Sequence, residues 1–141
     1  TLLEATGKKV AFLEHIVDVL RLTETTVIHG RAEDLGQSVV HRGKYDWALA
    51  RAVAELSTLA EYLLPFVAVG GHALAQKGEG AAAETQKAQT AIKTLGGQVQ
   101  RLVPIELRGL AETRYLVVLD KVAATPHKYP RRAGMPSKRP L

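Results

Sequence analysis

Cysteine is absent from the 141 residues of this chain, which excludes disulfide bonds and thiolate metal ligands. No uninterrupted apolar run reaches the roughly 20 residues that a helix needs to cross a bilayer. The five histidines stand far apart in the sequence and do not show the spacing of metal ligands. We therefore expect a chain without a metal site or a membrane partner, and a reducing cytoplasmic compartment fits it.

Recognisable catalytic patterns are also missing. No Ser–His–acid arrangement and no pair of carboxylates stands out, and the sequence has no glycine-rich phosphate loop. What is present is ordinary for a soluble globular domain, with 46% apolar and 23% charged residues. The length suits one domain with a substantial core.

Positive charge is concentrated at the C-terminus. Five of the 19 Lys and Arg residues lie in residues 125–141, a segment without any acid, whereas residues 1–124 carry 14 basic and 14 acidic side chains. We therefore divide the chain into a domain, 1–124, and a basic tail, 125–141. The tail is typical of an arm that contacts a polyanion such as nucleic acid. A solvated, disordered C-terminus is the alternative.

Apolar periodicity predicts alternating strands and helices. Thr58 and Glu61 have the spacing of a capping box for a helix through 59–67, and Pro65 predicts a kink or an early end. Gly70-Gly71 is expected to interrupt the chain before the next strand. The expected strands are 1–4, 25–30, 45–53, 72–78, 98–107 and 114–122. The other expected helices are 7–22 and 81–95, and a turn followed by a short helix or a loop is expected after Gly30.

This order predicts an α/β fold with a mostly parallel sheet and right-handed crossovers. Strand 98–107 contains Pro104 and suits a sheet edge, whereas 114–122 is continuously apolar in its middle and suits an interior position. The short connection between these two strands favours an antiparallel hairpin.

Ligands of open α/β sheets bind beyond the carboxyl ends of the strands. Glu4 ends the first strand, and a carboxylate there can accept two hydrogen bonds from the ribose of a nucleotide. A strand-ending Glu that only aids solubility is the alternative. After the second strand, the amides and Glu33 carboxylate of "GRAED" could meet an adenine edge beside the small Ala32. Glu33 and Asp34 could instead simply favour a helix N-terminus.

Two basic residues also stand at strand ends. Arg51 interrupts an apolar run, so its guanidinium needs a carboxylate, a phosphate or solvent. It could bind a ligand carboxylate or phosphate, or form a structural ion pair. Lys77 could face the same crevice or simply be exposed before a glycine turn.

These stretches together resemble a known family. From "TLLEATGKKVAFL" through "GRAED" and "ARAVAELSTLAEYLLPFVAVGGHALAQKG" to "YPRRAGMPSKRPL", the chain is similar to bacterial small-subunit ribosomal RNA guanine-N7 methyltransferases, also called glucose-inhibited division protein B. The resemblance implies the class I S-adenosylmethionine-dependent methyltransferase fold, a Rossmann-like sheet of order 3-2-1-4-5-7-6 with an antiparallel strand 7. Strand 1 and its glycine-rich loop are expected just before Thr1 and are missing from this chain.

The resemblance also implies the site. Glu4 corresponds to the ribose-binding acid, with Ala5 and Thr6 beside the adenosine of S-adenosylmethionine. Ala32 and Glu33 correspond to the pair that contacts adenine, and Arg51 to the arginine that faces the methionine moiety. A role in RNA binding is expected for four basic residues of the tail, which are Arg131, Arg132, Lys138 and Arg139.

The implied activity is methyl transfer from S-adenosylmethionine to N7 of a guanine in small-subunit ribosomal RNA, in the cytoplasm, with ribosomal RNA or the small subunit as partner. Guanine N7 carries a free lone pair, so no general base is needed and catalysis depends on proximity and orientation. A different nucleotide-binding Rossmann-like enzyme and a non-catalytic RNA-binding or assembly module are the alternatives. Without strand 1 the sheet has two unpaired edges, so we expect this chain to bind the cofactor weakly. Alternatively, another strand fills the gap, for example one exchanged with a second copy of the chain.

Overall fold

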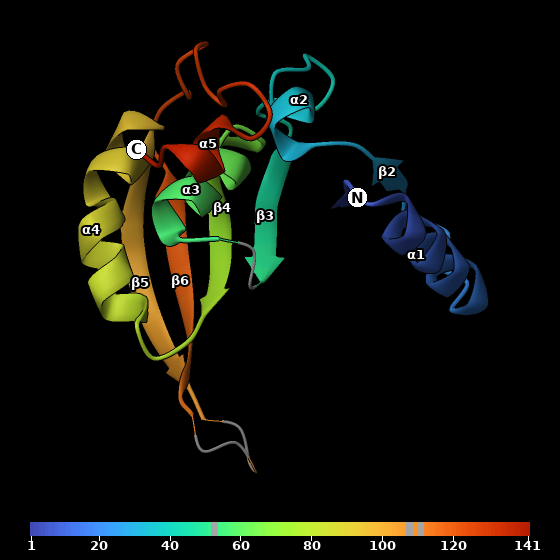
Figure 1. Cartoon of the computed structure of the whole chain (residues 1–141), viewed down its shortest axis with the longest axis horizontal. Coiled ribbons are helices and arrows are strands. Elements are labelled where there is room, and N and C mark those ends of the chain that lie inside the picture. The colour runs from blue at the N-terminus through green and yellow to red at the C-terminus, as the bar shows by residue number, and fades with distance from the viewer. Residues whose placement is uncertain (52–53, 107–108, 110–111) are drawn as a thin grey trace.

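The chain forms two separate β-sheets, seen in a computed structural model that describes residues 1–51, 54–106, 109 and 112–141. One sheet has two strands, β1 and β2, and the other has four strands in the order β3-β4-β6-β5 (Figure 1). The α/β architecture predicted from the sequence is confirmed, and its strands and helices alternate in the expected order up to the final hairpin.

The N-terminal unit is a strand–helix–strand. β1 (Leu2–Glu4) and β2 (Val27–His29) pair in parallel, and α1 (Gly7–Val19) connects them. The short helix α2 (Ala32–Leu35) follows β2. Figure 1 shows α1, β1 and β2 to one side of the larger sheet, beyond the edge that β3 forms.

The larger sheet combines one parallel and two antiparallel pairings. β3 (Tyr45–Arg51) runs parallel to β4 (Val67–Lys77), and β6 (Arg114–Lys121) lies antiparallel between β4 and β5 (Gly97–Ile105). The predicted hairpin, the edge position of β5 and the interior position of β6 are therefore confirmed. Residues 52–53 and 107 of the predicted strands lie outside the described residues.

Two helices cover one face of this sheet and form the core with it. α3 (Leu56–Leu63) ends just before Pro65, as the position of the proline predicts, and α4 (Ala81–Thr94) packs against α3 and β5. Apolar side chains from both helices and from β4 and β6 make a single buried cluster. Within the described residues, no helix is both long and apolar enough to cross a bilayer.

The predicted break at Gly70-Gly71 is wrong, because both glycines lie inside β4. Gly70 has a φ of 92°, and a Cβ on Gly71 would stand 2.6 Å from the carbonyl oxygen of Asp46. The pairing with β3 shifts at this point, since Tyr45 pairs with Val67 but Trp47 pairs with His72. The glycines thus allow a bulge within a continuous strand.

The predicted capping box of α3 is also wrong. The N-cap residue is Glu55, without a side-chain cap, and Thr58 and Glu61 lie inside the helix as buried residues. Both side chains bond the C-terminal segment instead, Thr58 Oγ1 donating to the Pro136 carbonyl and Glu61 accepting from Arg131. A polar side chain committed to a tertiary contact cannot cap its own helix.

The C-terminal segment, residues 125–141, packs on the body of the domain and does not extend as a solvated arm. Tyr129, Pro130 and Pro136 are buried, and the short helix α5 (Met135–Lys138) contacts α3. Arg42 donates hydrogen bonds to four carbonyl groups, three of which belong to this segment. The expectation of a free arm is therefore corrected: apolar burial and hydrogen bonds hold the segment in place.

Candidate functional site

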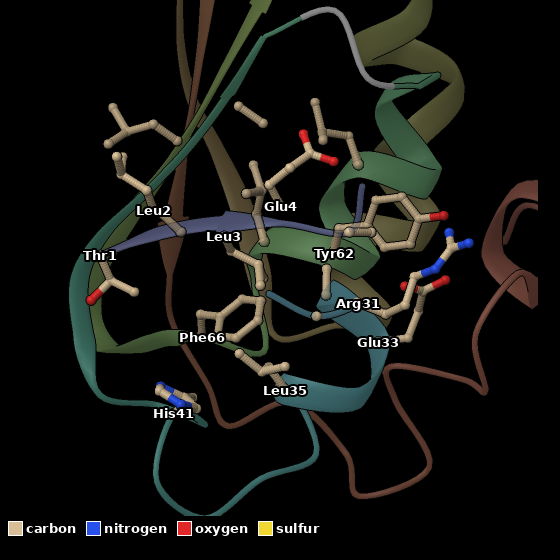
Figure 2. Close-up of a pocket in the computed structure, with 18 of the residues that line it drawn as sticks. Thr1, Leu2, Leu3, Glu4, Arg31, Glu33, Leu35, His41, Tyr62 and Phe66 are labelled. Carbon is tan, nitrogen blue, oxygen red and sulfur yellow. The ribbon is translucent and has the colours of Figure 1, made fainter. Parts of the chain in front are cut away.

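A cleft of about 630 Å³ lies between β1 and β3. Leu2, Leu3 and Glu4 line it from one side, and residues of β3 line it from the other. Figure 2 shows Leu3 close to Phe66 at the apolar floor of this cleft. An apolar cavity with a few polar groups at its rim is the usual form of a small-molecule site.

The cleft separates two free strand edges. Among the described residues, β1 pairs only with β2 and β3 pairs only with β4. Placed on either side of the cleft, the observed strands reproduce the order 3-2 and 4-5-7-6 that the family resemblance implies, with one position open between them. The cleft therefore includes both the rim where a ligand would bind and the place of a further strand.

Glu4 stands at the carboxyl end of β1 and lines the cleft, as predicted. Its Oε1 accepts a hydrogen bond of 2.8 Å from the backbone amide of Thr6, and Lys9 Nζ lies 3.9 Å from Oε2. The Thr6 amide, followed by weaker effects that include Lys9, holds the pKa of Glu4 below its usual value. An ionised carboxylate with one oxygen bonded and the other nearly free is suited to accept hydrogen bonds from hydroxyl groups.

Ala32 and Glu33 begin α2 and also line the cleft, so the structure brings them to the same cavity as Glu4. Glu33 is only 4% exposed. Its Oε1 accepts a 2.8 Å hydrogen bond from the amide of Gly134 in the C-terminal segment. Within the described part of the chain, Oε2 has no hydrogen-bond partner and is the oxygen left for a ligand.

Tyr62 is a cleft residue that the sequence did not reveal. Burial, and next the nearby carboxylate of Glu33, raise the pKa of its hydroxyl above the usual value. Arg31 and Ser137 line the cleft beside it. No sequence signal distinguishes these residues, because each lies in a stretch that also reads as an ordinary helix or loop.

The structure does not bring Arg51 into this group. It ends β3 as predicted, but its side chain is exposed and it is not among the cleft-lining residues. An arginine in an apolar run is tolerated here because solvent reaches it. Thr6, expected beside adenosine, is likewise not among the cleft-lining residues, whereas Ala5 is.

Lys77 is neither exposed nor directed to the cleft. Its side chain is 9% exposed, and Nζ lies 2.7 Å from Glu84 Oε2 and bonds the Ala54 carbonyl. The same Glu84 oxygen accepts the amide of Leu56 at the start of α3. The lysine thus ties the end of β4 to α4 and to the segment just before α3.

The four basic tail residues divide into two kinds. Arg131 forms a two-pronged ion pair with buried Glu61, whereas Arg132, Lys138 and Arg139 are exposed. The side-chain bond to Glu61 is the main cause that raises the pKa of Arg131. The sequence signal for this ion pair is the acid Glu61 inside the apolar run "LAEYLL", because a buried carboxylate needs a basic partner.

The strand order and an acid at the end of β1 define the class of protein, a class I methyltransferase fold. A solved rRNA methylase from Streptococcus thermophilus is similar to this fold, with a TM-score of 0.59 and 17% sequence identity over 86% of this chain and 72% of that one. At this identity the likeness concerns the fold alone.

Sequence comparison gives the particular family. The GidB family model, described as rRNA small subunit methyltransferase G, matches residues 1–111, and the chain belongs to this family. It is 52% identical over its whole length to the ribosomal RNA small subunit methyltransferase G of Roseiflexus castenholzii and 46% identical to that of Alkaliphilus oremlandii. The chain spans 60% and 59% of the lengths of these two curated relatives.

Proposed function

We propose that the protein transfers a methyl group from S-adenosylmethionine to N7 of a guanine in small-subunit ribosomal RNA. Membership of the GidB family is the observation that carries this proposal. It favours methyl transfer over the two alternatives, another Rossmann-like nucleotide enzyme and a non-catalytic RNA-binding module.

The residues at the rim of the cleft fit the adenosine part of this cofactor. Glu4 would accept hydrogen bonds from the two ribose hydroxyls through its ionised carboxylate. Ala32 leaves room for a flat ring, and the free Oε2 of Glu33 would accept a hydrogen bond from the adenine amine. Ala5, next to Glu4 in the sequence, also lines the cleft.

S-adenosylmethionine would supply an electrophilic methyl group on its sulfonium. The N7 lone pair of guanine would accept this methyl group, with a neutral thioether as the leaving group and the positive charge transferred to the purine. Since no proton leaves N7 before the attack, the chain needs no general base there. Its contribution is to orient the two reactants in line and close together. Arg51, free in solvent at the end of β3, would face the methionine moiety or the RNA.

Ribosomal RNA or the small ribosomal subunit is the proposed partner, in the cytoplasm. The exposed basic residues Arg132, Lys138 and Arg139 flank the docked part of the C-terminal segment. Cations in such positions bind RNA through its phosphates and make the affinity dependent on salt. The side chain of Arg131 is 23% exposed. Only this exposed part could contact RNA, because the rest is engaged with Glu61.

A further strand is proposed to complete the sheet. The curated relatives are longer than this chain, and β1 and β3 each present an unpaired edge to the cleft. A strand supplied by sequence preceding Thr1 in the gene would satisfy the backbone groups of both edges.

The proposal is tested with protein made from its complete gene. Isothermal titration calorimetry should give binding of S-adenosylhomocysteine, the product, and no binding of NAD. Incubation with S-adenosylmethionine carrying a tritiated methyl group should label deproteinised small-subunit RNA or intact subunits. Binding of NAD in place of the methyl donor would support an oxidoreductase, and RNA binding without either cofactor would support the non-catalytic module.

A further inference from the structure

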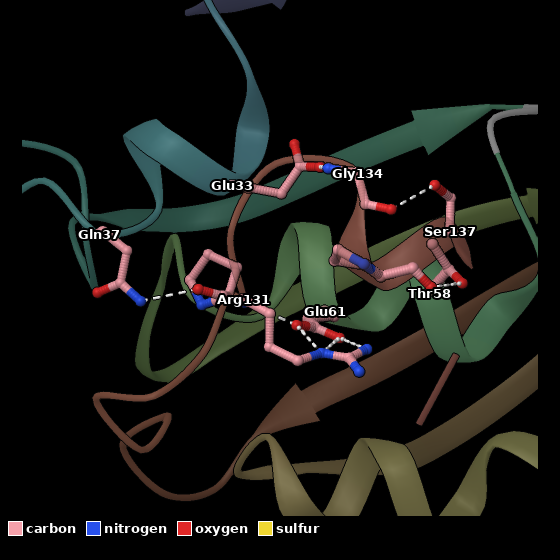
Figure 3. A network of polar contacts seen from close by, with 9 residues as sticks. Glu33, Gln37, Thr58, Glu61, Arg131, Gly134 and Ser137 are labelled. Atoms are coloured by element: carbon pink, nitrogen blue, oxygen red, sulfur yellow. Dashed lines mark hydrogen bonds and ion pairs between the residues drawn. The ribbon is translucent and has the colours of Figure 1, made fainter. Parts of the chain in front are cut away.

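The C-terminal segment is fixed to α3 by a buried carboxylate. Arg131 Nε donates to Glu61 Oε1 at 2.9 Å, and its Nη2 donates to Oε2 at 2.6 Å (Figure 3). The Arg131 backbone amide also donates to Oε1, at 2.8 Å. The Glu61 side chain is 0% exposed, so the ion pair with Arg131 offsets the free-energy cost of removing its charge from water.

Three residues further along, the same segment reaches the cofactor cleft. The Gly134 amide donates to Glu33 Oε1, and Thr58 Oγ1 donates to the Pro136 carbonyl at 3.1 Å. Gly134 has a φ of 80°, a conformation that glycine adopts without strain. Ser137 then lines the cleft beside Glu33. Figure 3 shows these contacts as one continuous network from α3 to α2.

The hydrogen bond from Gly134 fixes the orientation of the Glu33 carboxylate. With Oε1 held by the Gly134 amide, only Oε2 remains for a ligand in the cleft. Without the amide, a carboxylate that is 4% exposed would lose its one hydrogen bond and have to turn toward solvent. The segment is therefore a wall of the site and not only a cover for α3.

We propose that the docked C-terminal segment is part of the cofactor site, with Arg131 and Gly134 as positioning residues that orient Glu33 toward the adenine amine. This inference rests on the proposed function, because it takes the cleft as the S-adenosylmethionine site. The exposed Arg132, Lys138 and Arg139 belong to the same segment, so RNA held by them acts on a structure that also shapes the cleft. Cofactor and RNA affinities are then coupled, and the coupling is reciprocal.

The test compares arginine variants in the protein made from its complete gene. Arg131→Ala removes the anchor, and Arg131→Lys keeps the charge but loses the two-pronged geometry. Arg101→Ala, at an exposed position of β5 outside the cleft, is the matched control. The dissociation constant for S-adenosylhomocysteine is measured by calorimetry with and without saturating small-subunit RNA, at a temperature where circular dichroism shows each variant folded. A second route, Gly134→Ala, disturbs the amide without touching a charge.

We expect Arg131→Ala and Gly134→Ala to weaken S-adenosylhomocysteine binding by about fivefold or more, Arg131→Lys by less, and Arg101→Ala not at all. Saturating RNA should tighten cofactor binding in the wild type and not in Arg131→Ala. Equal cofactor affinity in all folded variants would overturn the inference, even if their melting temperatures fall. If the wild type itself binds no S-adenosylhomocysteine, the proposed function fails instead. If Arg131→Ala does not fold, Arg131→Lys and Gly134→Ala give the same two outcomes.

Discussion

Two carboxylates on the cleft, Glu4 and Glu33, are held in different ways. A neighbouring backbone amide holds Glu4, which is partly exposed, whereas an amide 101 residues away holds Glu33, which is buried. The first arrangement is local and could be predicted from the position of an acid at the end of a strand. The second could not, because no local pattern indicates that the C-terminal segment folds back onto α2.

Glu4→Gln tests the ribose contact. The amide keeps the shape of the side chain but loses the charge, and hydrogen bonds to an ionised acceptor are stronger than those to a neutral one. We therefore expect the affinity for S-adenosylhomocysteine to fall by about tenfold or more, measured by calorimetry. Glu14→Gln, an exposed acid on the adjoining α1, is the control and should bind normally. Unchanged affinity in Glu4→Gln would show that the ribose lies elsewhere.

Lys121 is a buried amine outside the cleft. Its Nζ bonds the carbonyls of Leu64 and Leu95 and the hydroxyl of Thr125, and burial, followed by the charge of Arg42, lowers its pKa to about 8. Between that pH and the ordinary lysine value of 10.5, the unfolded chain holds a proton that the folded chain has released. The contribution of Lys121 to stability must therefore rise with pH across this window.

The measurement is urea unfolding of the wild type and Lys121→Met at several pH values. The free energy of unfolding of the wild type, minus that of the variant, should increase from pH 8 toward 10.5 by at most about 1.4 kcal/mol per pH unit. Lys93→Met, an exposed lysine on α4, should show no such slope. A flat difference for Lys121→Met would mean that the amine stays charged in the fold.

At the scale of elements, the turn from α4 to β5 depends on one glycine. Gly96 has a φ of 81°, its carbonyl accepts the amides of Val122 and Ala123, and a Cβ on it would collide with the Ala123 carbonyl oxygen. Gly96→Ala therefore combines backbone strain with a collision. We expect a loss of about 3 kcal/mol or more in the free energy of unfolding.

Gly43→Ala separates the two effects. Gly43 has a φ of 63°, and a Cβ added to it would meet nothing within 4 Å, so only the backbone strain of about 1–2 kcal/mol remains. Thermal or urea unfolding of both variants gives the comparison. Equal losses at the two positions would mean that the Gly96 turn relaxes around a methyl group.

The elements that could be predicted from the sequence are those formed by interactions between residues close together in the chain. Helix α4 is rich in good helix formers and ends at glycines, and β6 is continuously apolar, so local sequence predicts both. Thr58 and Glu61 have local capping spacing, but their partners come from residues 131 and 136. A bulge at Gly71 likewise depends on Asp46 in the neighbouring strand. Long-range contacts of this kind have no periodic signature.

At the scale of the whole molecule, the open position between β1 and β3 bears on the proposed function, since neither strand pairs across it among the described residues. Glu4 of the proposed cofactor site lies on β1, whereas α3 and α4 build the core against the larger sheet. Among the described residues, β1 pairs with β2 and has no strand pairing with β3. The 141-residue chain should therefore bind S-adenosylhomocysteine weakly.

Calorimetry on the isolated chain and on the protein from its complete gene tests this expectation. The complete protein should bind more tightly and melt at a higher temperature, because the proposed further strand would pair with the edges of β1 and β3. Size-exclusion chromatography should show association of the isolated chain if those edges pair between copies. Micromolar or tighter binding by the isolated, monomeric chain would contradict the role assigned to the open position.

Methylation of guanine N7 in small-subunit ribosomal RNA is the central claim. The most direct test is nucleoside mass spectrometry of that RNA after incubation with the complete protein and S-adenosylmethionine carrying a deuterated methyl group. We expect deuterated 7-methylguanosine, formed by the wild type and reduced in Glu4→Gln. Label in any other nucleoside, or in none although the protein binds the cofactor, would contradict the claim.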